Sequence, residues 1–306
     1  MDDILVVGSE EKVESFIEIL KRRFTLTVKE EVNKFVGCEF EWIDNHVVLH
    51  QKGMVESLGV KFSENIDKKY DKAPTSPYMI VESVGDEDPS LDDCIQKRYQ
   101  QGVGSLMYLV KHSRPDISNP VRELSKGMKR ANNAHLKSLH RLISFVVNTK
   151  ERGLLIKPLM DGKMDWKMEI FSDSDWSSDR DTRKSVNGWS VFLCGSLICW
   201  GSRSQKHVTL SSTEAEYVAL SEASREIFFI KSVLEFMNVN VKRPITIRVD
   251  NLGAIYLAKN SGGKRSKHIE VRYHHIREKI SDGSVEIIFV KSEENISDGF
   301  TKNLAE

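Results

Sequence analysis

Four carboxylates in the carboxyl-terminal half of the sequence have the chemistry to hold divalent cations. They are Asp173, Glu216, Asp250 and Asp298. Two of them end predicted strands, one lies in the first turns of a predicted helix, and one stands near the start of the last predicted helix. Because they come from the ends of four separate elements, these acids can converge on one edge of a sheet.

Negative charges gathered in this way need a neutralising partner, because like charges a few ångströms apart raise one another's pKa. Oxygen-only ligands, with no cysteine or histidine cluster at metal-ligand spacing, favour Mg²⁺, for which Mn²⁺ can substitute. Two such ions about 4 Å apart can clamp the attacking and leaving oxygens of a phosphodiester. The quartet is therefore a candidate site for phosphodiester hydrolysis.

Each acid also has a structural alternative when it is taken singly, since the chain carries 45 acidic residues. Asp298 can simply cap the last helix, and Glu216 can serve only a capping box at the start of its own helix. Asp175 competes with Asp173 for the role at the end of the first strand. The case for a site depends on the four acids together.

Alternating apolar residues and turn residues predict the elements that would position these acids. Strands are predicted for KMEIFSDSDW, VNGWSVFLCG, SLICWGSRS, ITIRVDN and VEIIFVKS, and helices for NLGAIYLAK, HIEVRYHHIREKI and ISDGFTKNL. A long helix begins at SSTEAEYVAL, where Ser211 or Thr213 can cap it, and runs to about Phe236. This order indicates an α/β (α+β) domain with a mixed five-stranded sheet flanked by helices.

The upstream half predicts a different arrangement. Residues 11–24 have the apolar spacing of an amphipathic helix, and a hairpin that turns at Asp44 and Asn45 follows before a short helix, MVESLGVKF. Residues 71–93 hold three prolines and an acidic run, so we expect an exposed connection. Three helical segments come next, within GVGSLMYLVKH, PDISNPVRELSKGMKR and AHLKSLHRLISFVVNTK.

Composition limits the class of protein. The formal net charge is zero, so nucleic-acid affinity must come from a local patch. The four cysteines are not spaced like zinc ligands, and we expect them to be reduced thiols. No signal peptide or membrane-spanning run is evident, so we expect an intracellular protein without a membrane role, either cytoplasmic (in a virus-like particle) or nuclear. The sequence does not indicate an oligomeric state.

Long stretches around the acids resemble the ribonuclease H domain of Ty1/copia-type retrotransposon polyproteins. They are FSDSDWSSDRDTRKSVNGWSVFL, ICWGSRSQKHVTLSSTEAEYVAL, VDNLGAIYLAKN, SKHIEVRYHHIRE and NISDGFTK. Upstream, VGSLMYLVKHSRPDI resembles the connection segment of these polyproteins, and FVGCEFEWIDNHVVLHQKGMVESL resembles the region after the reverse transcriptase active site. The resemblance implies a partial palm/thumb remnant at 1–75, a linker and helical connection at 76–165, and a ribonuclease H-like domain at 166–306.

The resemblance also implies roles for the acids. Asp173 would bridge two Mg²⁺ ions, Glu216 and Asp250 would complete the shell of one ion and orient the attacking water, and Asp298 would hold the other ion. The implied reaction is endonucleolytic hydrolysis of the RNA strand of an RNA–DNA hybrid. Many cellular ribonucleases H carry a histidine shortly before the last aspartate, where this chain has KSEEN.

A basic stretch between the last two acids is a candidate phosphate-binding face. Its basic residues are Lys264, Arg265, Lys267, Arg272, Arg277 and Lys279. We expect His274 and His275 in the same stretch to pack or meet solvent rather than to bind metal. A basic helix can also be simply solvated, so this stretch alone does not define a binding site.

The opening residues match the end of the reverse transcriptase Y-x-D-D hairpin. Asp2 and Asp3 would be its aspartates, as a vestigial polymerase motif, and we expect no polymerase activity from this fragment.

A catalytically inactive relic that only binds nucleic acid or a partner is the alternative function. A transposase-like or integrase-like enzyme would share the general fold. The order of Asp, Glu and Asp on a strand, a helix and a strand disfavours that reading, as do the copia-like sequence motifs.

Overall fold

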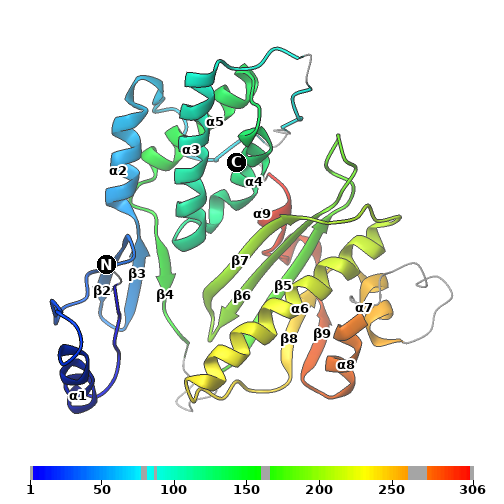
Figure 1. Ribbon diagram of the computed structural model, residues 1–306. Coiled ribbons are helices and arrows are strands. Elements are labelled where there is room, and N and C mark those ends of the chain that lie inside the picture. The colour runs from blue at the N-terminus through cyan, green and yellow to red at the C-terminus, as the bar shows by residue number, and fades with distance from the viewer. Residues whose placement is uncertain (1–2, 77–80, 86–87, 160–165, 261–273, 304–306) are drawn as a thin grey trace.

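A five-stranded mixed sheet forms the carboxyl-terminal part of the computed structural model (Figure 1), which describes residues 3–76, 81–85, 88–159, 166–260 and 274–303. Its strands are β5 (Met168–Asp175), β6 (Val186–Leu193), β7 (Ser196–Ser204), β8 (Ile245–Val249) and β9 (Val285–Phe289). In space they follow the order β7-β6-β5-β8-β9. β5, β6 and β7 form an antiparallel meander, whereas β8 lies parallel to β5 and β9 parallel to β8. The predicted fold class is confirmed.

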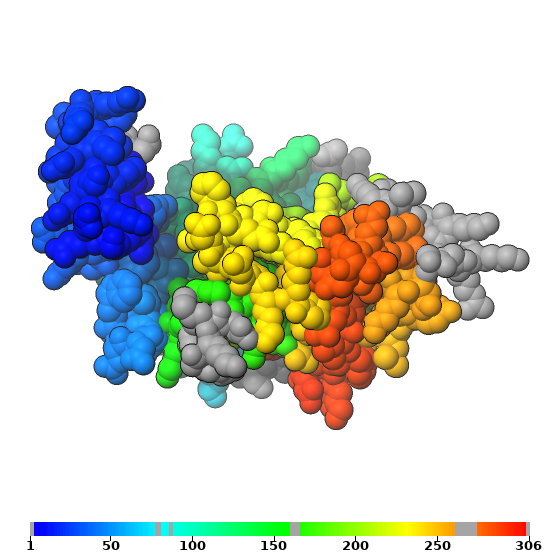
Figure 2. All heavy atoms as spheres, turned by 90° about the horizontal axis from the view of Figure 1, so that it is seen from below, coloured from blue at the N-terminus to red at the C-terminus, as the bar shows by residue number. Residues whose placement is uncertain are grey.

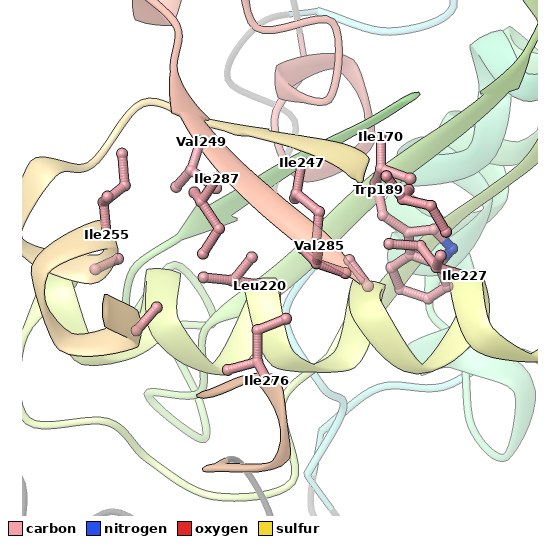
Figure 3. Packing of buried hydrophobic residues seen from close by; sticks show 14 of the residues in the cluster. Ile170, Trp189, Leu220, Ile227, Ile247, Val249, Ile255, Ile276, Val285 and Ile287 are labelled. Atoms are coloured by element: carbon pink, nitrogen blue, oxygen red, sulfur yellow. The ribbon is translucent and has the colours of Figure 1, made fainter. Parts of the chain in front are cut away.

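The helix α6 (Ser212–Phe236) lies across one face of this sheet (Figure 1). Its Leu220 and Ile227 face strand residues such as Ile247 across a continuous apolar core (Figure 3). The predicted end of this helix near Phe236 is confirmed. Two shorter helices, α7 (Leu252–Lys259) and α8 (His275–Ser281), complete this layer, and the first part of the helix predicted for HIEVRYHHIREKI lies outside the described residues.

A second apolar core lies upstream, between four helices. They are α2 (Lys52–Lys61), α3 (Asp93–His112), α4 (Ser118–Ser125) and α5 (Asn133–Asn148), with 3-10 turns at Ser63–Asn65, Pro115–Ile117 and Lys126–Met128. The three helical segments predicted here are confirmed, but the first begins earlier than expected. The Asp92 side chain caps it by accepting bonds from the backbone N–H groups of Cys94 and Ile95.

The expectation of an exposed connection over residues 71–93 is wrong in part. Ala73, Thr75 and Val81 are buried, and Val81 belongs to the upstream apolar core. The backbone N–H of Val81 donates to Glu123 Oε2 at 3.2 Å. A segment without periodicity can still be buried where its backbone groups find partners.

A small antiparallel sheet combines three strands from before the four upstream helices with one strand from after them. It contains β1 (Lys34–Phe35), β2 (Cys38–Ile43), β3 (His46–His50) and β4 (Leu154–Ile156). The predicted hairpin turn is confirmed, with Asp44 in the left-handed region at φ 49°. The amphipathic helix α1 (Glu10–Lys21) buries none of its residues and projects from one side of the molecule (Figure 2).

Helix α4 and the turn after it connect the upstream helices to the carboxyl-terminal part of the chain. The Arg122 Nε donates to Ser202 Oγ of β7 at 3.0 Å, and Asn119 Nδ2 donates to Asn303 Oδ1 at 3.0 Å. An ion pair between Lys126 and Asp179, with its nitrogen and oxygen 2.7 Å apart, adds a third link. The two cores therefore meet through polar contacts, while the division into domains at residues 75 and 165 stays a prediction.

Among the described residues, no helix has both the length and the apolar character needed to cross a bilayer.

Candidate active site

The first acid of the quartet lies near the end of the central strand. Asp173 on β5 pairs with Gly188 on β6 and is only 1% exposed. Side chains alternate along a strand, so Asp173 points away from the face on which Ile170 packs against α6. A buried carboxylate at this position needs nearby partners or a cation.

Glu216 reaches the same end of the sheet from α6. The helix starts where Ser211 Oγ accepts a bond from the backbone N–H of Glu214, so Ser211 is the cap. Glu216 Oε1 accepts from the backbone N–H of Ser174 at 3.1 Å. Its Oε2 is buried and finds no hydrogen-bond partner among the described residues. One oxygen is thus held in place while the other is left for an incoming ligand.

Asp250 completes a close trio. It follows β8, directly before Asn251, whose side chain caps α7 by accepting from the backbone N–H of Ala254. One carboxylate oxygen each from Asp173, Glu216 and Asp250 lies within 4.8 Å of the other two. This spacing suits three ligands around one cation. The trio includes Asp173 and not its neighbour Asp175.

Asp298 lies at the start of α9 (Asp298–Thr301), which follows a 3-10 turn at Ser292–Glu294. The hydroxyl of Thr301 donates to Asp173 Oδ2. The ammonium of Lys302 lies 3.1 Å from Asp298 Oδ1 and 3.8 Å from Asp173 Oδ2. The structure therefore brings three acids together directly and joins the fourth to them through a lysine.

Burial and mutual repulsion raise two pKa values in this site. Burial raises the pKa of Asp173 to about 7; the charge of Lys302 and the hydrogen bond from Thr301 oppose this rise, and the charges of Asp298 and Asp250 add to it. Burial raises the pKa of Glu216 to about 9, helped by the charges of Asp173 and Asp250. Both groups therefore hold protons more tightly than ordinary carboxyls unless a cation replaces those protons.

Two side chains near Asp298 were not singled out from the sequence. Thr301 and Lys302 stand three and four residues after Asp298, so one turn of helix returns them to its side. Asn295 also contributes, because its Nδ2 donates to the backbone carbonyl of Ser172 at 3.0 Å and ties the α9 segment to β5. The segment NISDGFTK contains all three residues, but only the packing of this segment against β5 shows which atoms they contact.

Gly188 allows α9 to approach the sheet. A Cβ at this position would lie 2.6 Å from Thr301 Cγ2 and 2.8 Å from the carbonyl oxygen of Ser297. We expect Gly188→Ala to push α9 outward, lowering the free energy of unfolding by about 1–3 kcal/mol. Loss of divalent-ion binding, measured by calorimetry, should accompany it.

The matched control is Gly104→Ala on α3, where an added Cβ meets no described heavy atom within 4 Å. Alanine in an open helical position should raise stability by about 0.5–1 kcal/mol. Equal effects of the two substitutions would show that the contact between α9 and β6 does not matter.

Most of the predicted phosphate-binding face lies outside the described residues, namely Lys264, Arg265, Lys267 and Arg272. Arg277 is described, and its Nε donates to the carbonyl oxygen of Leu257 at 3.0 Å. Its guanidinium also lies over the ring of Tyr217, 5.6 Å from the centroid. Arg277 thus makes contacts within the domain, and its predicted role in phosphate binding stays a prediction.

The histidines beside Arg277 hold α8 against α6. His274 Nδ1 lies 2.8 Å from the hydroxyl of Tyr217, and His275 Nε2 lies 2.8 Å from Ser224 Oγ.

At the amino terminus, Asp2 lies outside the described residues and Asp3 is exposed. His274, His275 and Asp3, which the structure describes, are not part of the acidic trio.

Comparison with known proteins gives long sequence matches. The retrovirus-related Pol polyprotein from transposon RE1 of Arabidopsis thaliana is 32% identical over 309 aligned residues, which cover 100% of this chain and 20% of that protein. The corresponding polyprotein from transposon RE2 of the same plant is 31% identical with the same coverage. A Pol polyprotein from transposon TNT 1-94 of Nicotiana tabacum is 35% identical over 205 residues, covering 67% of this chain. The chain thus spans about a fifth of the length of the first two relatives.

Family models and solved structures give weaker matches than these relatives do. No family model matches the chain. A solved ribonuclease H1 isolated from compost aligns with a TM-score of 0.32 and 17% identity, covering 44% of this chain and 91% of its own. Likeness at that level does not establish a fold or an activity.

Proposed function

Because the chain belongs to the Pol polyproteins of Ty1/copia-type retrotransposons, we propose that its carboxyl-terminal domain is a divalent-metal-dependent ribonuclease H that cleaves the RNA strand of RNA–DNA hybrids. The observation that carries this proposal is the buried trio of Asp173, Glu216 and Asp250, with ligand oxygens within 4.8 Å of one another. In this proposal Asp298, at the start of α9, is the fourth acid.

The residues of the trio suit a hard cation with oxygen ligands. The buried Glu216 Oε2 has no hydrogen-bond partner in the described part of the chain, and a cation would satisfy it. The raised pKa values of Asp173 and Glu216 reflect uncompensated negative charge, which a divalent ion would relieve. Cysteine sulfur is absent from the trio, which favours Mg²⁺ or Mn²⁺ over softer metals.

In this proposal the protein holds the carboxylate oxygens of the site in fixed positions. The Ser174 N–H fixes one Glu216 oxygen, and the Thr301 hydroxyl fixes one Asp173 oxygen. Asp173 is thereby shared between the trio and Asp298. When bound, divalent ions would supply Lewis-acid stabilisation of the scissile phosphate and a nucleophilic water. Recognition of the hybrid would depend on backbone shape and 2′-hydroxyl groups rather than on base sequence.

A fluorogenic RNA–DNA hybrid incubated with the purified chain tests the proposal. We expect cleavage of the RNA strand with Mg²⁺ or Mn²⁺ and none with EDTA, and no cleavage of a DNA duplex of the same sequence. Products should carry a 3′-hydroxyl and a 5′-phosphate. Binding of the hybrid without any metal-dependent cleavage would instead support the alternative, a nucleic-acid-binding module that has lost its chemistry.

A further inference from the structure

The ammonium group of Lys302 occupies an unusual place beside the acidic trio. It lies 3.1 Å from Asp298 Oδ1 and 3.8 Å from Asp173 Oδ2, so it sits between the two carboxylates. The Lys302 side chain is 41% exposed, whereas that of Asp173 is 2% exposed. A positive charge therefore enters a largely buried acidic site from its solvent side.

Asp173 takes part in two sets of contacts. One of its carboxylate oxygens forms the close trio with oxygens of Glu216 and Asp250. Its Oδ2 accepts from the Thr301 hydroxyl and lies 3.8 Å from the Lys302 ammonium, which also contacts Asp298. The trio is thus one candidate cation position, and the pair of Asp173 and Asp298, which the Lys302 ammonium already bridges, is a second.

We propose that Lys302 is an internal counterion that holds the second cation position in the metal-free protein and leaves it when a second divalent ion binds. This inference rests on the proposed metal-dependent function. An ammonium and a divalent ion cannot share the gap between the same two carboxylates, because their charges repel at this distance. The flexible, partly exposed stem of Lys302 can carry its charge out toward solvent.

Two consequences follow for ion binding. The ion held by the trio binds first, because it displaces no side chain. The second ion binds more weakly, because it must displace Lys302 from Asp298 and Asp173. Lys302 is therefore a positioning residue that sets the ion concentration at which the second position fills.

Lys302→Met tests this inference, because methionine keeps much of the stem and removes the charge. Mn²⁺ binding to the full chain is measured by calorimetry, and spin coupling between paired Mn²⁺ ions by electron paramagnetic resonance. We expect a tight first ion and a weak second ion in the unmodified chain. In the variant, the dissociation constant of the second ion should fall at least about tenfold, and the coupled signal should appear at lower Mn²⁺.

The control is Lys291→Met, which changes an exposed lysine near the same edge of the sheet and should leave both constants unchanged. Lys302→Arg should keep the second ion weak, since the charge remains. An unchanged or weaker second ion in Lys302→Met would overturn the inference while the trio still binds its ion. Absence of any Mn²⁺ binding in the unmodified chain would instead refute the proposed metal-dependent function, and the inference with it.

Discussion

Asp250→Asn is expected to lower hybrid cleavage at least about 100-fold while the protein stays folded. Asp250 is one of three carboxylates whose oxygens lie within 4.8 Å of one another, so its replacement by an amide removes a charged ligand from the centre of the site. Its charge also raises the pKa values of Asp173 and Glu216. Removing that charge should therefore leave the metal-free fold as stable as before, or more stable.

Single-turnover cleavage at saturating Mg²⁺ measures the rate, and thermal unfolding in EDTA measures the stability of the same preparation. Asp71→Asn is the matched control, because Asp71 is exposed and lies outside the site; it should cleave like the unmodified chain. If Asp250→Asn retained cleavage within threefold of the control, the acidic trio would not be the catalytic centre.

The sequence predicted the elements whose signals are local. The hairpin turn at Asp44 and the end of α6 near Phe236 follow from turn residues and helical periodicity, and both are confirmed. The mixed sheet was also predictable, because its five strands are separated by clear turn or helix signals. These features depend on neighbours within a few residues in the chain.

Features that depend on distant pairings were not predictable in the same way. β4 pairs with β3 across a hundred residues of intervening chain, and no local pattern marks that partnership. The approach of α9 to Gly188 and the placement of Lys302 depend on how close a helix comes to a strand. Sequence reasoning singled out the four acids, whose role stays a prediction, but not the side chains that hold or neutralise them, because those contacts are set by tertiary packing.

The metal-free protein is expected to lose stability as the pH rises from about 4 to about 9. The pKa of Asp173 is raised from 3.8 to about 7 and that of Glu216 from 4.5 to about 9, first by burial and then by neighbouring negative charge. Between the ordinary and the raised values, the folded state binds more protons than the unfolded state. The free energy of unfolding therefore falls with pH in this window, and the stabilisation is fully present only below the ordinary values.

A divalent ion should reverse this trend, because it replaces the protons that the buried carboxyls would otherwise hold. In EDTA we expect a loss of at least about 2 kcal/mol between pH 5 and pH 9, or about 5 °C in Tm, and a much smaller loss in Mg²⁺. Glu216→Gln is the informative variant, since its side-chain oxygen can still accept from the Ser174 N–H while carrying no charge. Thermal unfolding across this pH range should give a flatter profile for Glu216→Gln than for the unmodified chain in EDTA. Identical slopes for the two proteins would mean that the buried Glu216 is not the source of the pH dependence, and the case for a cation-requiring acidic centre would lose its electrostatic basis.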